Sequence, residues 1–363
     1  MKKLTLEKCF KLFTNCILVK GVSRACIYDL QRKNIYTVPL SIADIFNEDG
    51  FCNPAQFLAL LDKESKEAFL DYKSFLINHE LVFECEEYET TLFPNLNEEF
   101  LFPSKISNAV LDADSHLPYF TNNFLAQLAK LGCNYIQFRF FNIVEINELK
   151  RILEILKTSQ VKSFEIILPE DKNDNTFYQN ISLIILENPK ISSLIISDTQ
   201  LSEVYKEGAN GMGYILKIKD KIDNHHHCGI IDISNFSVNI TTYTESLKFN
   251  SCLNRKIAID KYGDIKNCPS MSATYGNISS ISLNEAINQP DFQKLWAINK
   301  DNISKCKSCE FRYVCTDCRA YIEDPNDILS APLKCGYDPF TNLWEDWSKN
   351  PIKLEAISFY GFN

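Results

Sequence analysis

The stretch CKSCEFRYVCTDC, residues 306–318, places four cysteines within thirteen residues. Two Cys-x2-Cys pairs are separated there by five residues, and three more cysteines stand apart at Cys252, Cys268 and Cys335. Cys252 is followed by ten residues, Gly263, four residues and then Cys268. Regular spacing across residues 252–335 indicates metal ligands rather than scattered core thiols.

Two kinds of metal centre are built from cysteines alone. A zinc ribbon uses four ligands for one ion and usually keeps its ligand pairs about 12 or more residues apart. Here the pairs are five residues apart, and seven cysteines are available. Iron–sulfur proteins commonly interleave their ligands, so that a cysteine near one group serves the neighbouring cluster. The spacing favours iron–sulfur clusters, with zinc and unligated structural cysteines as alternatives.

The composition indicates a soluble globular protein of two or three domains. The 363 residues are 45% hydrophobic and 23% charged, and no apolar run reaches membrane-spanning length. The net charge is −9 without a block of lysine and arginine, which argues against nucleic acid as a partner. Met1-Lys2-Lys3 is basic, but Glu7 and Lys8 interrupt the apolar run that a signal peptide needs. We expect a cytoplasmic protein with no membrane partner.

A reducing cytoplasm disfavours structural disulfides, so fourteen cysteines need another explanation. Eight of them lie between Cys228 and Cys335. The others are scattered in apolar surroundings and are expected to be small core residues: Cys9, Cys16, Cys26, Cys52, Cys85 and Cys133.

Residues 1–100 are predicted to form an α+β unit whose element order is winged-helix-like. The polar Gln31-Arg32-Lys33 predicts a hairpin turn, while Ser41 and Asn53-Pro54 are predicted to begin helices. Strands are expected at residues 15–21, 24–30, 34–39 and 81–85, and helices over 42–46, 53–61 and 66–78.

Residues 101–224 alternate between strands and helices, which predicts a parallel sheet with helical crossovers. The segment is too short for an eight-stranded barrel of about 250 residues. We therefore expect a partial (βα) barrel or an open sheet, within an α/β multidomain protein. Strands are predicted at residues 109–113, 135–140, 164–169, 194–197 and 214–218, and helices at 122–131, 146–157 and 177–187.

Residues 225–363 form the third predicted domain, which is rich in cysteine. Alternating apolar residues from Ile257 to Ile265 predict a hairpin with Tyr262-Gly263-Asp264 at its turn, and this hairpin would bring Cys252 and Cys268 together. The pattern Cys-x10-Gly-x4-Cys, then Cys-x2-Cys-x5-Cys-x2-Cys and a last cysteine, resembles the SPASM domain. That domain ends many radical S-adenosylmethionine enzymes that modify ribosomal peptides.

One subgroup of the family is especially similar. The stretches NSCLNRK (250–256), KNCPS (266–270), CEFRYVCTDCR (309–319) and KCGYDP (334–339) resemble the peptide maturases of grasp-with-spasm systems, which are encoded beside an ATP-grasp peptide ligase. The resemblance implies two auxiliary 4Fe-4S clusters. It assigns one cluster to Cys252, Cys268 and Cys318, and the other to Cys306, Cys309, Cys315 and Cys335.

Two points of this assignment stay open. The dense run has two residues, Thr316 and Asp317, where the SPASM pattern often has three, so the division of Cys315 and Cys318 between the clusters is uncertain. The first set has three ligands, which leaves either an open iron site or a position for Cys228.

Cys228 ends the run His225-His226-His227. Three interpretations remain: a solvated polar turn before a strand at residues 229–233, metal ligation by Cys228 with or without His227, and a catalytic thiol–imidazole pair.

The three-cysteine motif of radical S-adenosylmethionine enzymes, Cys-x3-Cys-x2-Cys, is missing. The predicted strand 109–113 is followed by DSHLPY, and Cys133 is the one cysteine between Cys85 and Cys228. We therefore expect that this chain alone does not cleave S-adenosylmethionine, and that residues 101–224 are a degenerate form of the barrel. The sequence identifies no catalytic residue, so an enzymatic role stays open.

The resemblance suggests a role in the maturation of a ribosomal peptide. The winged-helix-like unit resembles the precursor-peptide recognition elements of peptide-modifying enzymes, which bind a leader segment along a strand edge and a helix. The alternative for this unit is a purely structural cap. The expected partners are therefore a precursor peptide and an ATP-grasp ligase. The alternatives are an iron–sulfur electron-transfer or scaffold partner of that ligase, and a structural zinc-binding interaction protein.

Overall fold

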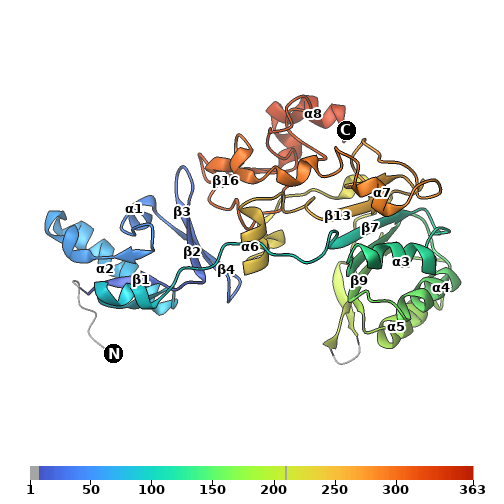
Figure 1. The fold of residues 1–363 in the computed structure, drawn as a ribbon, viewed down its shortest axis with the longest axis horizontal. Helices are drawn as coiled ribbons and strands as arrows, with labels where there is room; N and C mark the ends of the chain where they lie inside the picture. Colours follow the sequence, from blue (N-terminus) through green and yellow to red (C-terminus); the bar gives the residue numbers. More distant parts are fainter. Residues whose placement is uncertain (1–7, 209–210, 363) are drawn as a thin grey trace. The chain divides into compact units, whose positions relative to one another are not determined.

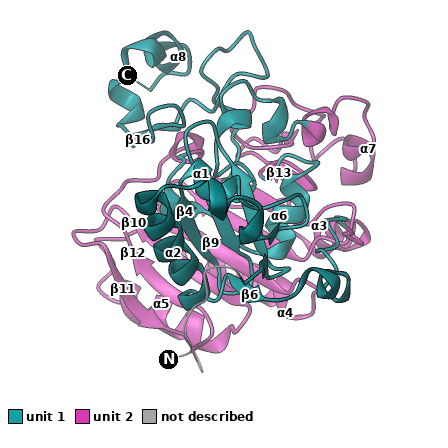
Figure 2. Ribbon diagram, turned by 90° about the vertical axis from the view of Figure 1, so that its left-hand side faces the viewer, with its two compact units in different colours: residues 1–100, 230–251, 298–363 teal, residues 101–229, 252–297 magenta. Residues whose placement is uncertain are grey.

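The computed structural model describes residues 8–208 and 211–362 (Figure 1). The chain forms two compact units (Figure 2). Unit 1 comprises Met1–Phe100, Ile230–Ser251 and Ile298–Asn363, and unit 2 comprises Leu101–Gly229 and Cys252–Ala297. These units divide the cysteine-rich third of the chain between them, whereas the sequence predicts three consecutive domains. The basic start of the chain, Met1-Lys2-Lys3, lies outside the described residues.

Unit 2 is built on an eight-stranded sheet with the order β11-β12-β10-β9-β8-β7-β13-β14. Neighbours from β12 to β13 are parallel, and the two outermost pairs are antiparallel. The mixed α/β prediction is confirmed, while a barrel-like closure stays a prediction. The strands are β7 (Asn108–Ala113), β8 (Tyr135–Phe140), β9 (Ser163–Pro169), β10 (Ile191–Ser197), β11 (Glu203–Glu207), β12 (Tyr214–Lys217), β13 (Lys256–Ile259) and β14 (Ile265–Lys266).

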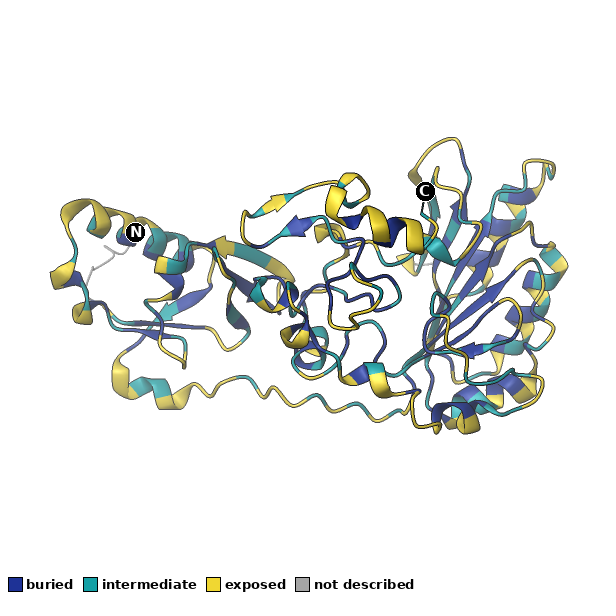
Figure 3. Ribbon diagram, turned by 90° about the horizontal axis from the view of Figure 1, so that it is seen from above, coloured by how far each residue is buried: buried dark blue, intermediate teal, exposed yellow. Residues whose placement is uncertain are grey.

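Three helices connect the parallel strands: α3 (Asn122–Lys130), α4 (Ile146–Lys157) and α5 (Phe177–Glu187). Right-handed crossovers between successive neighbouring strands place all connecting helices on one face of a sheet. Figure 1 shows α3, α4 and α5 together on one side of this sheet, and the strands β7 to β10 are largely buried (Figure 3). The carboxyl ends of β7 and β8 therefore share one edge, a usual place for functional residues in parallel sheets.

The hairpin of β13 and β14 confirms the prediction for residues 257–265. Gly263 at its turn has φ +85, a conformation that side chains other than glycine rarely adopt. Cys252 lies just before β13 and Cys268 just after β14, so the hairpin holds both cysteines at its base. A short helix, α7 (Leu283–Ile287), follows and is capped by Ser282.

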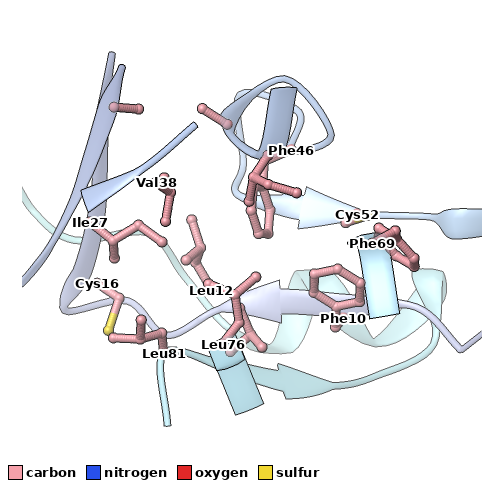
Figure 4. Close-up of a cluster of buried hydrophobic side chains, with 14 of the residues drawn as sticks. Phe10, Leu12, Cys16, Ile27, Val38, Phe46, Cys52, Phe69, Leu76 and Leu81 are labelled. Carbon is pink, nitrogen blue, oxygen red and sulfur yellow. The ribbon is translucent and has the colours of Figure 1, made fainter. Parts of the chain in front are cut away.

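The amino-terminal part of unit 1 contains two three-stranded antiparallel sheets, with orders β5-β1-β6 and β2-β3-β4. Helix α2 (Lys63–Asn78) packs its apolar residues against them, and Figure 4 shows Phe10, Phe69 and Leu76 in the shared core. The strands are β1 (Phe10–Leu12), β2 (Cys16–Lys20), β3 (Ala25–Asp29), β4 (Asn34–Val38), β5 (Phe51–Cys52) and β6 (Val82–Glu84).

The predicted hairpin of residues 24–39 is confirmed by the β3–β4 pairing. Two predicted helix starts are wrong in part. Helix α1 (Leu40–Ala43) begins after Pro39, so Ser41 lies inside it rather than capping it. Asn53 does cap the next turn, but Pro54–Gln56 is a single 3-10 turn. Leu58 is buried but Leu60 is 85% exposed, so only part of the predicted apolar face packs into the core.

The remaining elements of unit 1 are short: α6 (Ile240–Ser246), β15 (Tyr337–Asp338), β16 (Leu343–Trp344) and α8 (Leu354–Phe359). The strand predicted at residues 229–233 is reduced to an isolated bridge between Ile231 and Cys335. Val19 and Tyr28 of the amino-terminal sheet share a core with Phe311 of the cysteine-rich loop. None of the described helices is long and apolar enough to cross a membrane.

Candidate metal centres

All fourteen cysteines lie in the described part of the chain, and none is in a disulfide bond. Of the six predicted core cysteines, five are buried and Cys9 is partly exposed, so that prediction is confirmed for five. Burial raises the pKa of Cys16, Cys52 and Cys133 to about 12. These thiols are therefore protonated at neutral pH, which makes them poor nucleophiles.

Four of the predicted ligands line one cavity in unit 1: Cys306, Cys309, Cys315 and Cys335. The cavity holds about 370 Å³ of non-protein space, part of it open to solvent. A 3-10 turn, Cys306–Ser308, brings the first pair to one side, with the Cys309 amide donating to the Cys306 carbonyl at 2.9 Å. The bridge between Ile231 and Cys335 holds the fourth cysteine beside them. Cys318 is buried and is not among the lining residues.

The described residues that line this cavity include three cations and no carboxylate. The cations are Lys300, Lys305 and Arg312. Burial raises the pKa of Cys306 to about 12 and of Cys315 to about 11, and the Lys300 charge opposes both shifts. A metal displaces such thiol protons on binding, and nearby positive charge favours the resulting thiolates. The surroundings therefore suit an anionic centre.

Unit 2 holds a second group of cysteines around the β13–β14 hairpin: Cys228, Cys252 and Cys268. The Cys228 sulfur lies 3.1 Å from Ser270 Oγ and 3.3 Å from the His225 carbonyl oxygen. A hydrogen bond from Cys268 lowers the pKa of Cys228, and the same bond raises the pKa of Cys268. Lys256 Nζ lies 3.1 Å from the Cys252 sulfur.

The histidine run forms a 3-10 turn, His225–His227. His227 is exposed, and its Nε2 lies 3.3 Å from Asp223 Oδ1. The Cys228 sulfur contacts the backbone of His225. The arrangement agrees with the polar-turn interpretation for His227, and it brings Cys228 to the cysteine group.

A buried ion pair lies at the carboxyl ends of β7 and β8. Arg139 donates to both oxygens of Asp112 at 2.6 and 2.7 Å, and the two residues are direct partners in the strand register. They are 6% and 2% exposed. The Arg139 charge also contributes to the low pKa of Cys228. A charged residue inside each of two apolar strands was the sequence signal for this pair.

Zinc and iron–sulfur clusters demand different spacings of their ligands. A zinc ion gathers its ligands around one point, whereas a cluster binds one cysteine per iron and so keeps its thiolates farther apart. Among the residues that the structure describes, no three Cys, His, Asp or Glu side chains converge to hold a single ion. Four cysteines around a cavity with cationic walls fit a cluster better than a closed zinc site.

Comparison with known protein families gives one match. Residues 251–310 match the model of SPASM, an iron–sulfur cluster-binding domain. The matched segment includes Cys252, Cys268, Cys306 and Cys309. No curated protein matches the chain. The chain therefore carries a SPASM domain, which binds iron–sulfur clusters.

Proposed function

We propose that this protein is a maturation component for a ribosomally synthesised peptide, and that it holds two 4Fe-4S clusters and docks the precursor. The observation that carries the cluster assignment is the cavity of unit 1, where four regularly spaced cysteines meet three cations. When bound, such a cluster supplies one-electron redox chemistry. The chain's own part is to hold thiolates apart at fixed positions, to exclude water and to balance their charge.

The proposed ligands of the unit 1 cluster are Cys306, Cys309, Cys315 and Cys335. Cys315 lines the cavity and Cys318 does not, which supports giving Cys315 to this set. For the other cluster we propose Cys252 and Cys268 with Cys228, because the Cys228 sulfur lies beside Cys268 and Ser270.

Metal analysis of anaerobically purified and reconstituted protein tests the clusters. We expect about eight iron and eight acid-labile sulfide per chain, from two cubanes of four irons each. Cys309→Ser and Cys228→Ser should each perturb one cluster, while the buried core cysteine variant Cys133→Ser should keep the wild-type content. A chain that takes up only zinc would refute the cluster proposal and leave the structural zinc alternative.

The peptide-docking part of the proposal rests on the outer edge of β2. Strand β2 pairs with β3 in a register fixed by two hydrogen bonds, from Leu30 N to Asn15 O and from Gly21 N to Arg24 O. In this register the amide and carbonyl of Leu18 point away from β3. No described residue bonds to that amide or carbonyl. A cavity runs beside this edge and is lined by Leu18, Phe46 and Tyr243 among others. An extended peptide pairs readily with such an edge.

Leu18→Pro tests the docking edge, because proline removes the outward N–H without touching the bonds to β3. We expect binding of the precursor peptide encoded beside the gene to weaken about tenfold, ~1.4 kcal/mol, as measured by fluorescence anisotropy. Leu18→Ala is the matched control, since it removes the same side chain and keeps the N–H. Equal affinities for both variants would argue against pairing at β2.

Peptide mass then separates a maturase from a scaffold. The precursor is incubated with the reconstituted protein, with and without the ATP-grasp ligase. A mass change that requires this protein supports an enzymatic or cofactor role. An unchanged mass in every combination, with peptide binding intact, supports the scaffold alternative.

A further inference from the structure

Each cysteine group contains a lysine whose ammonium group faces the sulfurs. In unit 1, Lys300 is 4% exposed and lines the four-cysteine cavity. In unit 2, Lys256 begins β13, is partly buried, and places Nζ 3.1 Å from the Cys252 sulfur. The two lysines come from a 3-10 turn and a strand, so no shared local motif explains the common arrangement.

The charge of Lys300 exceeds what the surrounding carboxylates balance. Among described residues, Asp317 is its one carboxylate partner within ion-pair distance, at 3.8 Å. Asp317 is 1% exposed and is already paired with buried Arg319 at 2.8 Å. Asn250 also donates to it at 2.5 Å. Two buried cations therefore share one carboxylate, which leaves one positive charge in excess.

An excess buried charge is costly unless a partner of opposite charge lies near it. Besides Asp317, the ionisable groups that act on Lys300 are three cysteines of the cavity, Cys306, Cys315 and Cys335. Lys300 also donates to the Thr316 carbonyl at 3.3 Å, which directs its ammonium group toward this loop. Cysteine thiolates are thus the groups that would balance its charge.

In unit 2, the positive charge of Lys256 likewise lacks a carboxylate that balances it among the described residues. None of the described carboxylates lies within ion-pair distance of it. Asp112 is engaged by both nitrogens of Arg139, and Asp260 pairs with Lys266 at 2.8 Å. The ionisable groups that act on Lys256 are Cys252, Cys268 and Cys228, which would carry negative charge once a metal displaces their protons. Its counter-charge is again a group of cysteines.

We propose that Lys300 and Lys256 are the built-in counter-charges of the two clusters and raise the reduction potential of each. This inference rests on the proposed cluster binding. Reduction adds one electron, taken from a low-potential donor such as dithionite, to a centre that is already anionic with its thiolates. A fixed positive charge in a low-dielectric site stabilises the reduced form more than the oxidised form. Both lysines are positioning residues that act through the ligating sulfurs.

The test is a redox titration of reconstituted protein, followed by electron paramagnetic resonance. In Lys300→Met, which keeps the chain length and loses the charge, the ratio of reduced to oxidised cluster at a fixed potential should fall about tenfold, which is 59 mV for one electron. Lys300→Arg should keep the wild-type ratio. Lys256→Met should change the signal of the other cluster instead.

Lys305→Met is the matched control for unit 1. Lys305 lines the same cavity, but its side chain is 26% exposed, so solvent screens its charge more than that of buried Lys300. Its partner Glu323, at 3.6 Å, also pairs with Lys353 at 2.9 Å. Lys266→Met serves unit 2, because Lys266 is paired with Asp260. We expect the reduction potential of the cluster to shift less in each control than in Lys300→Met or Lys256→Met.

The iron and sulfide content of every variant distinguishes a failure of the counter-charge role from a failure of cluster binding. Full clusters with an unchanged potential in Lys300→Met and Lys256→Met would overturn the counter-charge role and leave the proposed function standing. If Lys300→Met loses its cluster while Lys300→Arg keeps it, charge is required and the proposal is supported. Loss of the cluster in both Lys300→Met and Lys300→Arg would mean that the lysine contributes only packing, and this result would refute the counter-charge proposal. Wild-type protein without iron would overturn cluster binding itself.

Discussion

Asp112 and Arg139 place two full charges inside the sheet of unit 2, where they form an ion pair. Arg139→Met removes one partner and leaves the Asp112 carboxylate buried at 2% exposure. We expect the free energy of unfolding to fall by about 3–5 kcal/mol, measured by urea denaturation of cluster-free protein. The double variant Asp112→Leu with Arg139→Met should recover most of the loss, because no unpaired charge remains.

Glu154→Gln is the control for that experiment. Glu154 and Lys157 form an exposed ion pair on α4, with side chains 67% and 57% exposed. Its removal should cost less than about 0.5 kcal/mol. If Arg139→Met costs no more than this control, the buried pair does not stabilise the fold.

Single residues were predictable where the intervals between them along the sequence indicate a shared chemical role. Spacing singled out seven cysteines, of which four line one cavity and two, Cys252 and Cys268, flank the β13–β14 hairpin. The charges around them were not found. Lysine, arginine and aspartate are usually at the surface, and nothing in the sequence near Lys256 or Lys300 marks it as facing cysteines. Asp112 and Arg139 meet only because β7 and β8 pair in one particular register.

At the scale of elements, the connection from β7 to α3 occupies the place where radical S-adenosylmethionine enzymes carry their three-cysteine motif. In this chain α4 holds that connection in place. Glu148 accepts a hydrogen bond from the Leu117 amide at 3.0 Å, and Arg151 donates to the carbonyls of Phe120 and Leu117 at 2.8 Å. The segment is thus tied by backbone contacts to a helix.

Glu148→Gln should weaken this tie in a pH-dependent way. The hydrogen bond from Arg151, together with that from the Leu117 amide, lowers the pKa of Glu148 below its ordinary value of 4.5. The carboxylate therefore stabilises the fold above about pH 4.5, and its contribution is lost as the pH falls through the lowered pKa. We expect the variant to be about 1–2 kcal/mol less stable at pH 7.

The measurement is the difference in unfolding free energy between wild type and variant at several pH values. It should shrink toward zero at acidic pH. Glu145→Gln is the control, because the Glu145 side chain makes no capping hydrogen bond at the start of the same helix. A difference that stays constant with pH would contradict the ionic role of Glu148.

Elements with a strong apolar period were predicted well. The bounds of α4 and α5 agree with the sequence pattern, because each helix buries one regular face against the sheet. The helices predicted over residues 42–46 and 53–61 are shorter in the structure, where α1 ends at Ala43 and Asn53 caps a 3-10 turn. A capping signal marks where a turn begins, and tertiary burial decides how far it continues.

At the scale of the whole chain, unit 1 depends on segments that are far apart in the sequence. Val19 and Tyr28 share a core with Phe311, Val314 and Tyr337. A fragment of residues 1–100 would expose the apolar side chains of that core. We expect the fragment to lack a cooperative unfolding transition in calorimetry and to bind a hydrophobic dye, unlike the full chain.

A cooperative and monomeric fold of residues 1–100 would contradict this expectation and would support the predicted domain boundary. Boundaries of this kind cannot be derived from local patterns. Periodicity and turn residues define single elements, whereas the assignment of β13 beside β7, or of Phe311 beside Tyr28, follows from pairing across hundreds of residues.

The alternation of the chain between its two units also sets an order of assembly during protein synthesis. The segments of unit 2 have all been made once Ala297 is added, so the thiols of Cys228, Cys252 and Cys268 can be gathered first. The cavity of unit 1 waits for Cys335. Ribosomes need on the order of 10–50 s to translate from residue 100 to residue 335. Throughout that interval the amino-terminal sheet of unit 1 remains without part of its core, a period in which a chaperone or a bound peptide would find it accessible.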